Sequence, residues 1–201
     1  MFVELSEVNL EVQLESSSSA NAKTLILSHP HPLFGGTMTN KVIDQIYRRG
    51  VEQDWSVLRY NTRGAGQSTG THDKGIAETK DLEELVAWAL TQKNFSADHL
   101  IMVGYSFGSW LTAKVAAKLN KPCVLIAPAV TMYPFPVEEF TVPKTIFSAE
   151  NDELIPIQKT IDYFSSLPEP KKHIMIPKAD HYFIGTTTLL IREVLKELSS
   201  L

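Results

Sequence analysis

Short apolar runs rich in β-branched residues alternate along this chain with longer segments of helical periodicity. This alternation constrains the fold more than any other feature, because it is typical of a parallel sheet whose strands are joined by helices. The predicted strands are residues 24–27, 57–60, 100–103, 123–126, 145–147 and 174–176. The predicted helices are residues 38–49, 76–90, 110–119, 157–164 and 188–198, with Gly50 as the stop signal of the first. We therefore predict an α/β fold, a mostly parallel sheet with helices on both faces.

The first twenty residues follow a different pattern. Apolar side chains at positions 8, 10, 12 and 14 alternate with polar neighbours, which is typical of a strand with one buried face. We expect this strand to be antiparallel and to lie at the edge of the sheet. The 201 residues suit one buried core and show no linker or internal repeat, so we expect a single domain over residues 1–201.

Composition and charge exclude several classes of protein. Apolar residues make up 43% of the chain and charged residues 21%, which is ordinary for a globular protein. The net charge of −4 and the scattered Lys and Arg residues offer no basic face, so we expect no nucleic-acid partner. No apolar run approaches the ~20 residues of a membrane span, and no signal peptide is visible. The single cysteine, Cys123, suits a reducing compartment, so we expect a cytoplasmic protein without a membrane partner.

The segment Gly104-Tyr105-Ser106-Phe107-Gly108 lies between a predicted strand and a predicted helix. This G-x-S-x-G pattern indicates a nucleophilic serine when it occupies such a sharp strand-to-helix turn, where only glycine fits two positions away. Ser106 is thus the predicted nucleophile, and the N–H of Phe107 at the helix start is a predicted oxyanion donor. Residues 66–70 match the same pattern, but no helix follows directly, so we interpret Ser68 as a loop serine.

A serine nucleophile needs a base to take its proton and an acid to orient that base. Asp152 follows the strand 145–147, and His181 follows the strand 174–176. Since the carboxyl ends of parallel strands meet at one edge of a sheet, these side chains are expected to approach Ser106. Asp180 is a weaker candidate for the acid, because a carboxylate adjacent to His181 cannot easily reach the far nitrogen of its ring. The predicted catalytic residues are therefore Ser106, Asp152 and His181.

The remaining histidines are weaker candidates for the base. His99 precedes a strand and His173 begins one, which places both at the opposite edge of the sheet, and His72 lies in a polar loop. His29 and His31 are two residues apart, a spacing compatible with metal ligands, but no further cluster of suitable ligands is nearby in the sequence. A rigid turn is the alternative interpretation of that segment.

Taken together, these features resemble the α/β-hydrolase superfamily, and within it the small lidless bacterial hydrolases related to the dienelactone hydrolase group. The resemblance is carried by residues 29–36, 60–68 and 104–108, by Asp152, and by Asp180-His181, in the chain order Ser, Asp, His. It implies a serine hydrolase that forms an acyl-enzyme with small-molecule esters or thioesters and requires no metal or organic cofactor. Dienelactone hydrolases proper use a cysteine, whereas this chain has Ser106 there; Cys123 is expected to be a buried core residue.

Within this resemblance, the stretch SHPHPLFGGTMTN after the first parallel strand becomes an oxyanion loop. Pro30 and Pro32 have no N–H, so the second donor is predicted to be His31, with Leu33 as the alternative. The histidines of this loop are then expected to matter more for their backbone than for their imidazole rings.

Residues 129–144 stand where larger superfamily members carry a lid domain, and they are only long enough for a loop. Phe34, Met132, Tyr133 and Phe135, together with Phe107 and Phe140, are expected to form an apolar wall for a small acyl or alkyl group, unless they simply cover the sheet edge. We therefore predict a carboxylesterase. The alternatives are a non-enzymatic binding or scaffolding protein with the hydrolase fold, or a hydrolase of lactone, amide or carbon–carbon bonds.

Overall fold

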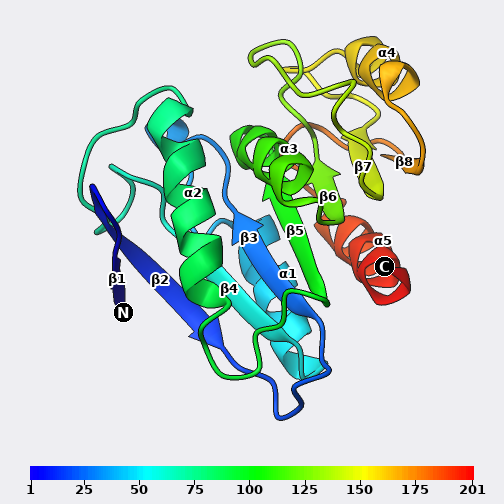
Figure 1. The fold of residues 1–201 in the computed structure, drawn as a ribbon. Coiled ribbons are helices and arrows are strands. Elements are labelled where there is room, and N and C mark those ends of the chain that lie inside the picture. The colour runs from blue at the N-terminus through cyan, green and yellow to red at the C-terminus, as the bar shows by residue number, and fades with distance from the viewer.

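Eight strands form one sheet in the computed structural model, which describes residues 1–201 (Figure 1). The strands are β1 (Phe2–Glu4), β2 (Asn9–Glu15), β3 (Thr24–Ser28), β4 (Ser56–Tyr60), β5 (Leu100–Tyr105), β6 (Cys123–Ile126), β7 (Lys144–Ala149) and β8 (Lys171–Ile176). Their order across the sheet is β1-β2-β4-β3-β5-β6-β7-β8. Strands β3 to β8 are mutually parallel, whereas β1 and β2 are antiparallel to their neighbours. The predicted mostly parallel sheet is confirmed.

Each predicted helix is present, with shifted ends. The helices are α1 (Lys41–Glu52), α2 (Ile76–Ala89), α3 (Phe107–Leu119), α4 (Ile157–Ser166) and α5 (Thr187–Ser200), with a short 3₁₀ turn η1 (Pro32–Phe34). The prediction that Gly50 ends the first helix was wrong, because α1 continues through it to Glu52. A Cβ at Gly50 would lie 2.8 Å from Val57 Cγ2, so the glycine lets α1 approach β4 closely. No helix combines the length and the apolar character needed to cross a membrane.

Two apolar clusters cover the two faces of the sheet. Helices α2 and α3 pack on one face through residues such as Leu82, Leu85 and Leu111. Helices α1 and α5 pack on the other face through residues such as Ile43 and Leu190. Strands β3, β4, β5 and β6 have no exposed residue, which explains why their sequences are continuous apolar runs rather than alternating ones. The predicted helix layers on both faces are confirmed, in a single-domain α/β fold.

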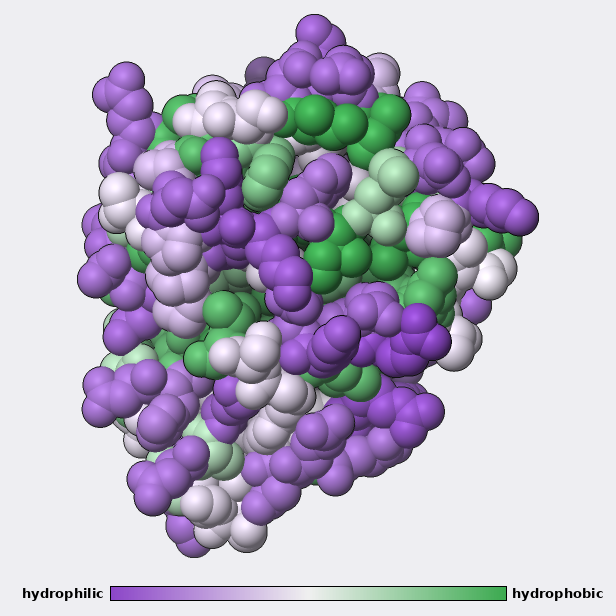
Figure 2. Space-filling view, turned by 90° about the vertical axis from the view of Figure 1, so that its right-hand side faces the viewer, coloured by the Kyte–Doolittle hydropathy of each residue, from purple (hydrophilic) through white to green (hydrophobic).

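The two edges of the sheet are built differently. The antiparallel N-terminal strand is confirmed as β2, but the short β1 pairs outside it and forms the edge itself. Three residues are too few to show an alternating pattern, so β1 had no signal in the sequence. At the opposite edge, β8 begins with Lys171 and Lys172, and such charges oppose pairing with another chain. Figure 2 faces this side of the molecule, where hydrophilic residues surround smaller hydrophobic patches.

The connection between β6 and β7 contains no helix or strand, so the structure has a loop at the place of a lid. This loop is anchored on both sides. The Trp110 indole N–H donates to the Pro134 carbonyl over 2.9 Å, and the Tyr163 hydroxyl donates to the Pro136 carbonyl over 3.0 Å. The ring of Tyr133 stacks on Trp110 with centroids 4.5 Å apart. The loop therefore has a defined position over the carboxyl edge of the sheet.

Candidate active site

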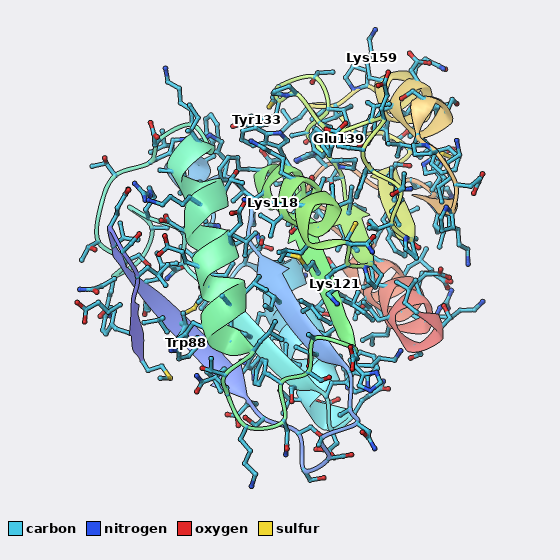
Figure 3. All side chains as sticks on the ribbon, in the orientation of Figure 1. Trp88, Lys118, Lys121, Tyr133, Glu139 and Lys159 are labelled. Atoms are coloured by element: carbon cyan, nitrogen blue, oxygen red, sulfur yellow. The ribbon has the colours of Figure 1, made fainter.

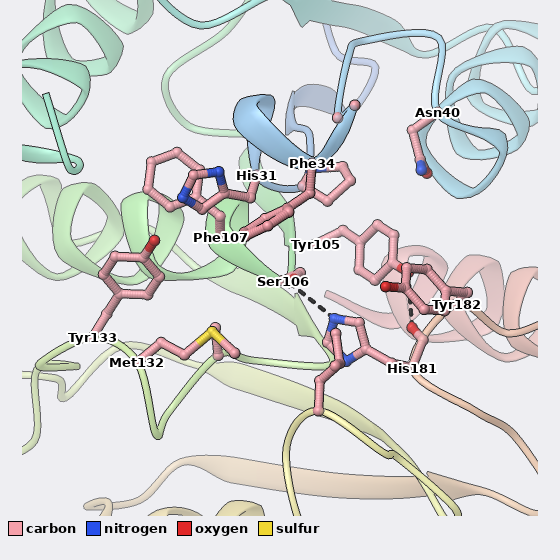
Figure 4. A pocket seen from close by; sticks show the side chains of 15 residues that line it. His31, Phe34, Asn40, Tyr105, Ser106, Phe107, Met132, Tyr133, His181 and Tyr182 are labelled. Atoms are coloured by element: carbon pink, nitrogen blue, oxygen red, sulfur yellow. Dashed lines mark hydrogen bonds between the residues drawn. The ribbon is translucent and has the colours of Figure 1, made fainter. Parts of the chain in front are cut away.

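Ser106 occupies the sharp turn between β5 and α3. Its backbone is in a sparsely populated conformation, with φ 52 and ψ −114, and its N–H donates to the Ile126 carbonyl over 2.9 Å. A Cβ at Gly104 would lie 2.3 Å from the Gly108 carbonyl oxygen, and a Cβ at Gly108 would lie 2.3 Å from the Ser28 carbonyl oxygen. Both glycines are thus required by close backbone packing, and the turn presents the Ser106 hydroxyl to the pocket (Figure 4).

The structure brings Ser106, His181 and Asp152 together, as Figure 4 shows for the first two. The His181 Nε2 lies 3.0 Å from Ser106 Oγ, and its Nδ1 lies 2.8 and 3.0 Å from the two Asp152 carboxylate oxygens. Both the histidine ring and the carboxylate are buried, with 4% of each side chain exposed. Burial keeps water from competing for the bond between them.

Asp152 is itself held by backbone donors. Its Oδ1 accepts the N–H groups of Leu154 and Ile155 over 3.0 and 2.7 Å. Asp180, the weaker candidate, instead accepts the N–H of Ile184 over 2.8 Å. Of the three acidic residues after β7, Glu150 and Glu153 are exposed, and only the side chain of Asp152 is buried. The Asp152 carboxylate lies against the ring of His181.

The second G-x-S-x-G match has a structural role. Ser68 Oγ donates to the Asn61 carbonyl over 2.7 Å and accepts the Glu11 N–H over 2.8 Å. Both hydroxyl functions are thereby used in joining the loop after β4 to β2. Ser68 is a loop serine, as predicted.

The imidazole ring of His29 has a structural role that the sequence did not indicate. Its Nδ1 lies 2.6 Å from the Pro30 carbonyl oxygen, and its Nε2 accepts the Thr62 N–H over 3.0 Å. Burial lowers the pKa of His29 to about 4, and a neutral ring with one donor and one acceptor satisfies both contacts. The expectation that the loop histidines matter mainly for their backbone was wrong for His29, because its imidazole joins the loops after β3 and β4. His31 faces other neighbours, His72 and Phe107, so the two rings do not form a paired set of ligands.

Two backbone N–H groups beside Ser106 have no acceptor within the protein. Phe107 is the first residue of α3, where an N–H has no partner within the helix, and the N–H of His31 makes no protein hydrogen bond either. The N–H of Leu33 donates to the Nδ1 of His31 over 3.2 Å, and Leu33 is 70% exposed outside the pocket. Leu33 is therefore not available as the second oxyanion donor, contrary to the alternative drawn from the sequence.

A pocket of about 320 Å³ opens in front of Ser106. Phe34, Met132 and Tyr133 line it, as predicted, together with His31 and Tyr182 (Figure 4). Phe135 was predicted to line it as well and does not, because its ring packs against Tyr163 with centroids 5.3 Å apart.

Tyr105, Asn40 and Tyr182 line the pocket and were not identified from the sequence. Tyr105 is the variable residue before the serine in the nucleophile motif, and its hydroxyl donates to the His181 carbonyl over 2.8 Å. Nothing in the motif indicates this contact, since it joins residues 76 apart in the chain. Phe140 is fully buried in the core and forms no part of the pocket wall.

A model of the X-Pro dipeptidyl-peptidase (S15) family matches residues 17–135, more than half of the chain and including the turn at Ser106. The chain belongs to the S15 family of α/β hydrolases. A second model, that of PhoPQ-activated pathogenicity-related proteins, matches residues 108–200. An uncharacterized protein of Rickettsia prowazekii, RP471, is 30% identical to this S15-family chain in an alignment 188 residues long, which covers 88% of the chain and 79% of the relative.

Solved structures agree with this assignment. An α/β serine hydrolase homologue from Coxiella burnetii is 28% identical, with a TM-score of 0.87 over 98% of this S15-family chain and 96% of its own. A putative α/β hydrolase from Agrobacterium tumefaciens is 25% identical, with a TM-score of 0.87 over 99% and 94% of the two chains. A lidless α/β serine hydrolase from Xanthomonas campestris is 26% identical, with a TM-score of 0.81 over 91% and 85%. The fold and the family are thus those of α/β serine hydrolases.

Proposed function

We propose that this S15-family chain is a carboxylesterase that hydrolyses small esters or thioesters through an acyl-enzyme. The observation that carries the proposal is the hydrogen-bonded arrangement of Ser106, His181 and Asp152 at the floor of a pocket. A nucleophile, a base within hydrogen-bond reach of it and an acid that orients the base are the components of covalent acyl transfer.

In the proposed reaction, Ser106 Oγ attacks the carbonyl carbon of the ester while His181 Nε2 takes the hydroxyl proton. Asp152 accepts the Nδ1–H of His181 and stabilises the imidazolium that forms. The tetrahedral intermediate collapses with release of the alcohol or thiol, which receives the proton from His181. Water then attacks the acyl-enzyme with His181 as base, which frees the acid and restores Ser106.

The oxyanion of the tetrahedral intermediate is assigned to the N–H groups of Phe107 and His31. Both lie in residues that line the pocket, and neither N–H has a protein acceptor. Loss of one such donor typically costs about 10²–10³ in kcat. The close approach of Gly36 to the Pro30 carbonyl, where a Cβ would lie 2.0 Å away, folds the loop so that His31 stays at the pocket.

Hydrolysis of a peptide bond is the second candidate, and the match to the dipeptidyl-peptidase model favours it. A dipeptidyl-peptidase must bind the ammonium group of its substrate, which calls for a carboxylate in the pocket. No Asp or Glu lines the pocket in front of Ser106. We therefore propose ester hydrolysis rather than peptide hydrolysis as the activity of this chain.

The decisive experiment compares purified wild-type protein with Ser106→Ala, with Ser68→Ala as the matched control. We expect wild type and Ser68→Ala to hydrolyse p-nitrophenyl acetate and to be labelled by a fluorophosphonate probe. Ser106→Ala should lose the labelling and at least the ~10²–10⁴ that general-base assistance supplies. Undiminished turnover in Ser106→Ala, or no labelling of wild type, would refute the proposal and favour a non-enzymatic protein with the hydrolase fold.

A further inference from the structure

A second groove adjoins the pocket in front of Ser106. The two share His31, Met132 and Tyr133 as walls, and the groove continues toward Trp110, Ile76 and two lysines. The stacked rings of Trp110 and Tyr133 form one side of it. A substrate held at Ser106 therefore has a second surface within reach, beyond the bond that is cleaved.

The charged side chains of this groove are positive, whereas the chain as a whole carries a net negative charge. Lys74 and Lys114 line it and no carboxylate does, although the chain has a net charge of −4. The Lys114 ammonium lies 5.0 Å from the centroid of the Trp110 ring, so it stands directly beside the aromatic wall. Burial and the neighbouring His72 lower the pKa of His31, so the positive charge of the groove comes mainly from the two lysines.

Glu78, a carboxylate of the turn beside the groove, is fully buried. Glu78 has no exposed side-chain surface, and its two oxygens accept the N–H groups of Asp73 and Gly75 over 2.8 and 2.9 Å. Its Oε1 also lies 2.6 Å from the Nδ1 of His72. Glu78 thus holds the turn that carries Lys74. Lys74 and Lys114 themselves form no salt bridge within the protein, although the exposed Asp73 precedes Lys74 in the chain.

We propose that this groove, lined by Lys74, Lys114 and the Trp110–Tyr133 stack, binds an anionic group of the substrate, so that the preferred esters carry a carboxylate or a phosphate on their acyl or alcohol part. This inference rests on the proposed esterase function and narrows its substrate class. An anion attached to an apolar body suits this groove, because the anion can pair with the two ammonium groups while the apolar body packs on the aromatic rings. It also agrees with the absence of a carboxylate for a substrate ammonium.

The test compares three p-nitrophenyl or related esters on wild type and on the double variant Lys74→Gln, Lys114→Gln. The neutral ester is p-nitrophenyl butyrate, mono-p-nitrophenyl glutarate carries a carboxylate on the acyl side, and 4-butyryloxybenzoate carries one on the alcohol side. We expect wild type to favour one of the anionic esters in kcat/KM over the neutral ester. The double variant should lower that preference roughly five- to tenfold, mainly through KM, and added salt should lower it in wild type.

Lys118→Gln is the matched control. Lys118 lies on the same helix, α3, but pairs with Glu83 over 2.6 Å and lies apart from Tyr133 in Figure 3. It should keep the wild-type preference. Equal kcat/KM for neutral and anionic esters in wild type, or a preference that the double variant retains, would overturn the inference while leaving the esterase proposal intact.

A binding measurement separates the two proposals fully. Calorimetric titration of the Ser106→Ala protein with each intact ester reports on the groove without turnover. We expect tighter binding of an anionic ester, weakened by the two lysine substitutions. Equal binding of all three esters would refute the groove assignment, whether or not wild type turns over any ester.

Discussion

The hydroxyl of Tyr105 donates a hydrogen bond to the main-chain carbonyl of His181 over 2.8 Å. The residue that precedes the proposed nucleophile thus holds the loop that carries the proposed base. On its other side, the N–H of His181 donates to Glu153 over 3.0 Å. The backbone of His181 is therefore fixed by two neighbours, in addition to the bond between its ring and Asp152.

Replacing Tyr105 with Phe should separate positioning from stability. The variant keeps the ring and loses one buried hydrogen bond, which costs about 1 kcal/mol of unfolding free energy. Because the His181 loop loses one restraint, we expect kcat for p-nitrophenyl acetate to fall about tenfold with little change in KM. Steady-state kinetics and urea unfolding check this, and an unchanged kcat would show that the contact does not position the base.

Replacing Asp152 with Asn should leave the fold nearly intact and remove most of the activity. The amide cannot stabilise an imidazolium or fix the tautomer of His181, so we expect kcat to fall by about 10²–10⁴. Asp180→Asn serves as the control, because Asp180 bonds to the Ile184 N–H rather than to the ring. If Asp180→Asn lost as much activity as Asp152→Asn, the assignment of the acid would be wrong.

Replacing Gly108 with Ala tests the packing of the nucleophile turn. The added methyl would lie 2.3 Å from the Ser28 carbonyl oxygen, a backbone atom that cannot move without shifting β3. We expect a loss of unfolding free energy of about 3 kcal/mol or more, or failure to fold. In Gly185→Ala the new methyl meets no atom within 4 Å, and only the positive φ of 75 opposes it, so its cost should be about 1–2 kcal/mol. Chemical denaturation of both variants measures these losses of unfolding free energy. Equal losses in the two variants would contradict the steric explanation.

His29 should make stability depend on pH. Its pKa is lowered from the ordinary value of 6.5 to about 4 by burial, so the unfolded chain binds more protons between those pH values. The contribution of neutral His29 is therefore complete above pH 6.5 and is lost as the pH falls toward 4, by about 3 kcal/mol. In His29→Asn, urea unfolding from pH 7 to 4 should show a correspondingly flatter profile. Parallel profiles for the two proteins would contradict this prediction.

The features that could be predicted from the sequence are those that depend on short stretches of the chain. Buried parallel strands appear as apolar runs, and the turn at Ser106 appears as two glycines because backbone atoms occupy the space of their side chains. The alternation of strands and helices indicates a parallel sheet, and in a parallel sheet the residues that follow the strands lie at the same edge. The positions of Asp152 and His181 at that edge could therefore be predicted.

Contacts between distant loops could not be predicted in the same way. Phe34 and Phe135 are both aromatic loop residues, and only the path of the backbone decides that the first faces the pocket and the second packs on Tyr163. The ring of His29 meets Thr62, which is 33 residues away. Gly50 resembles a helix stop in the sequence, yet it serves close packing against Val57 within the helix.

The loop between β6 and β7 is fastened to α3 by the bond from Trp110 to Pro134 and by the stack on Tyr133. These two contacts join the helix that begins beside Ser106 to the loop whose residues Met132 and Tyr133 line the pocket. For the proposed esterase, we therefore expect an entrance that keeps its shape and admits substrates without closing over them. With no lid to open, the chemical steps are expected to limit turnover, so kcat at saturating substrate should depend little on solvent viscosity.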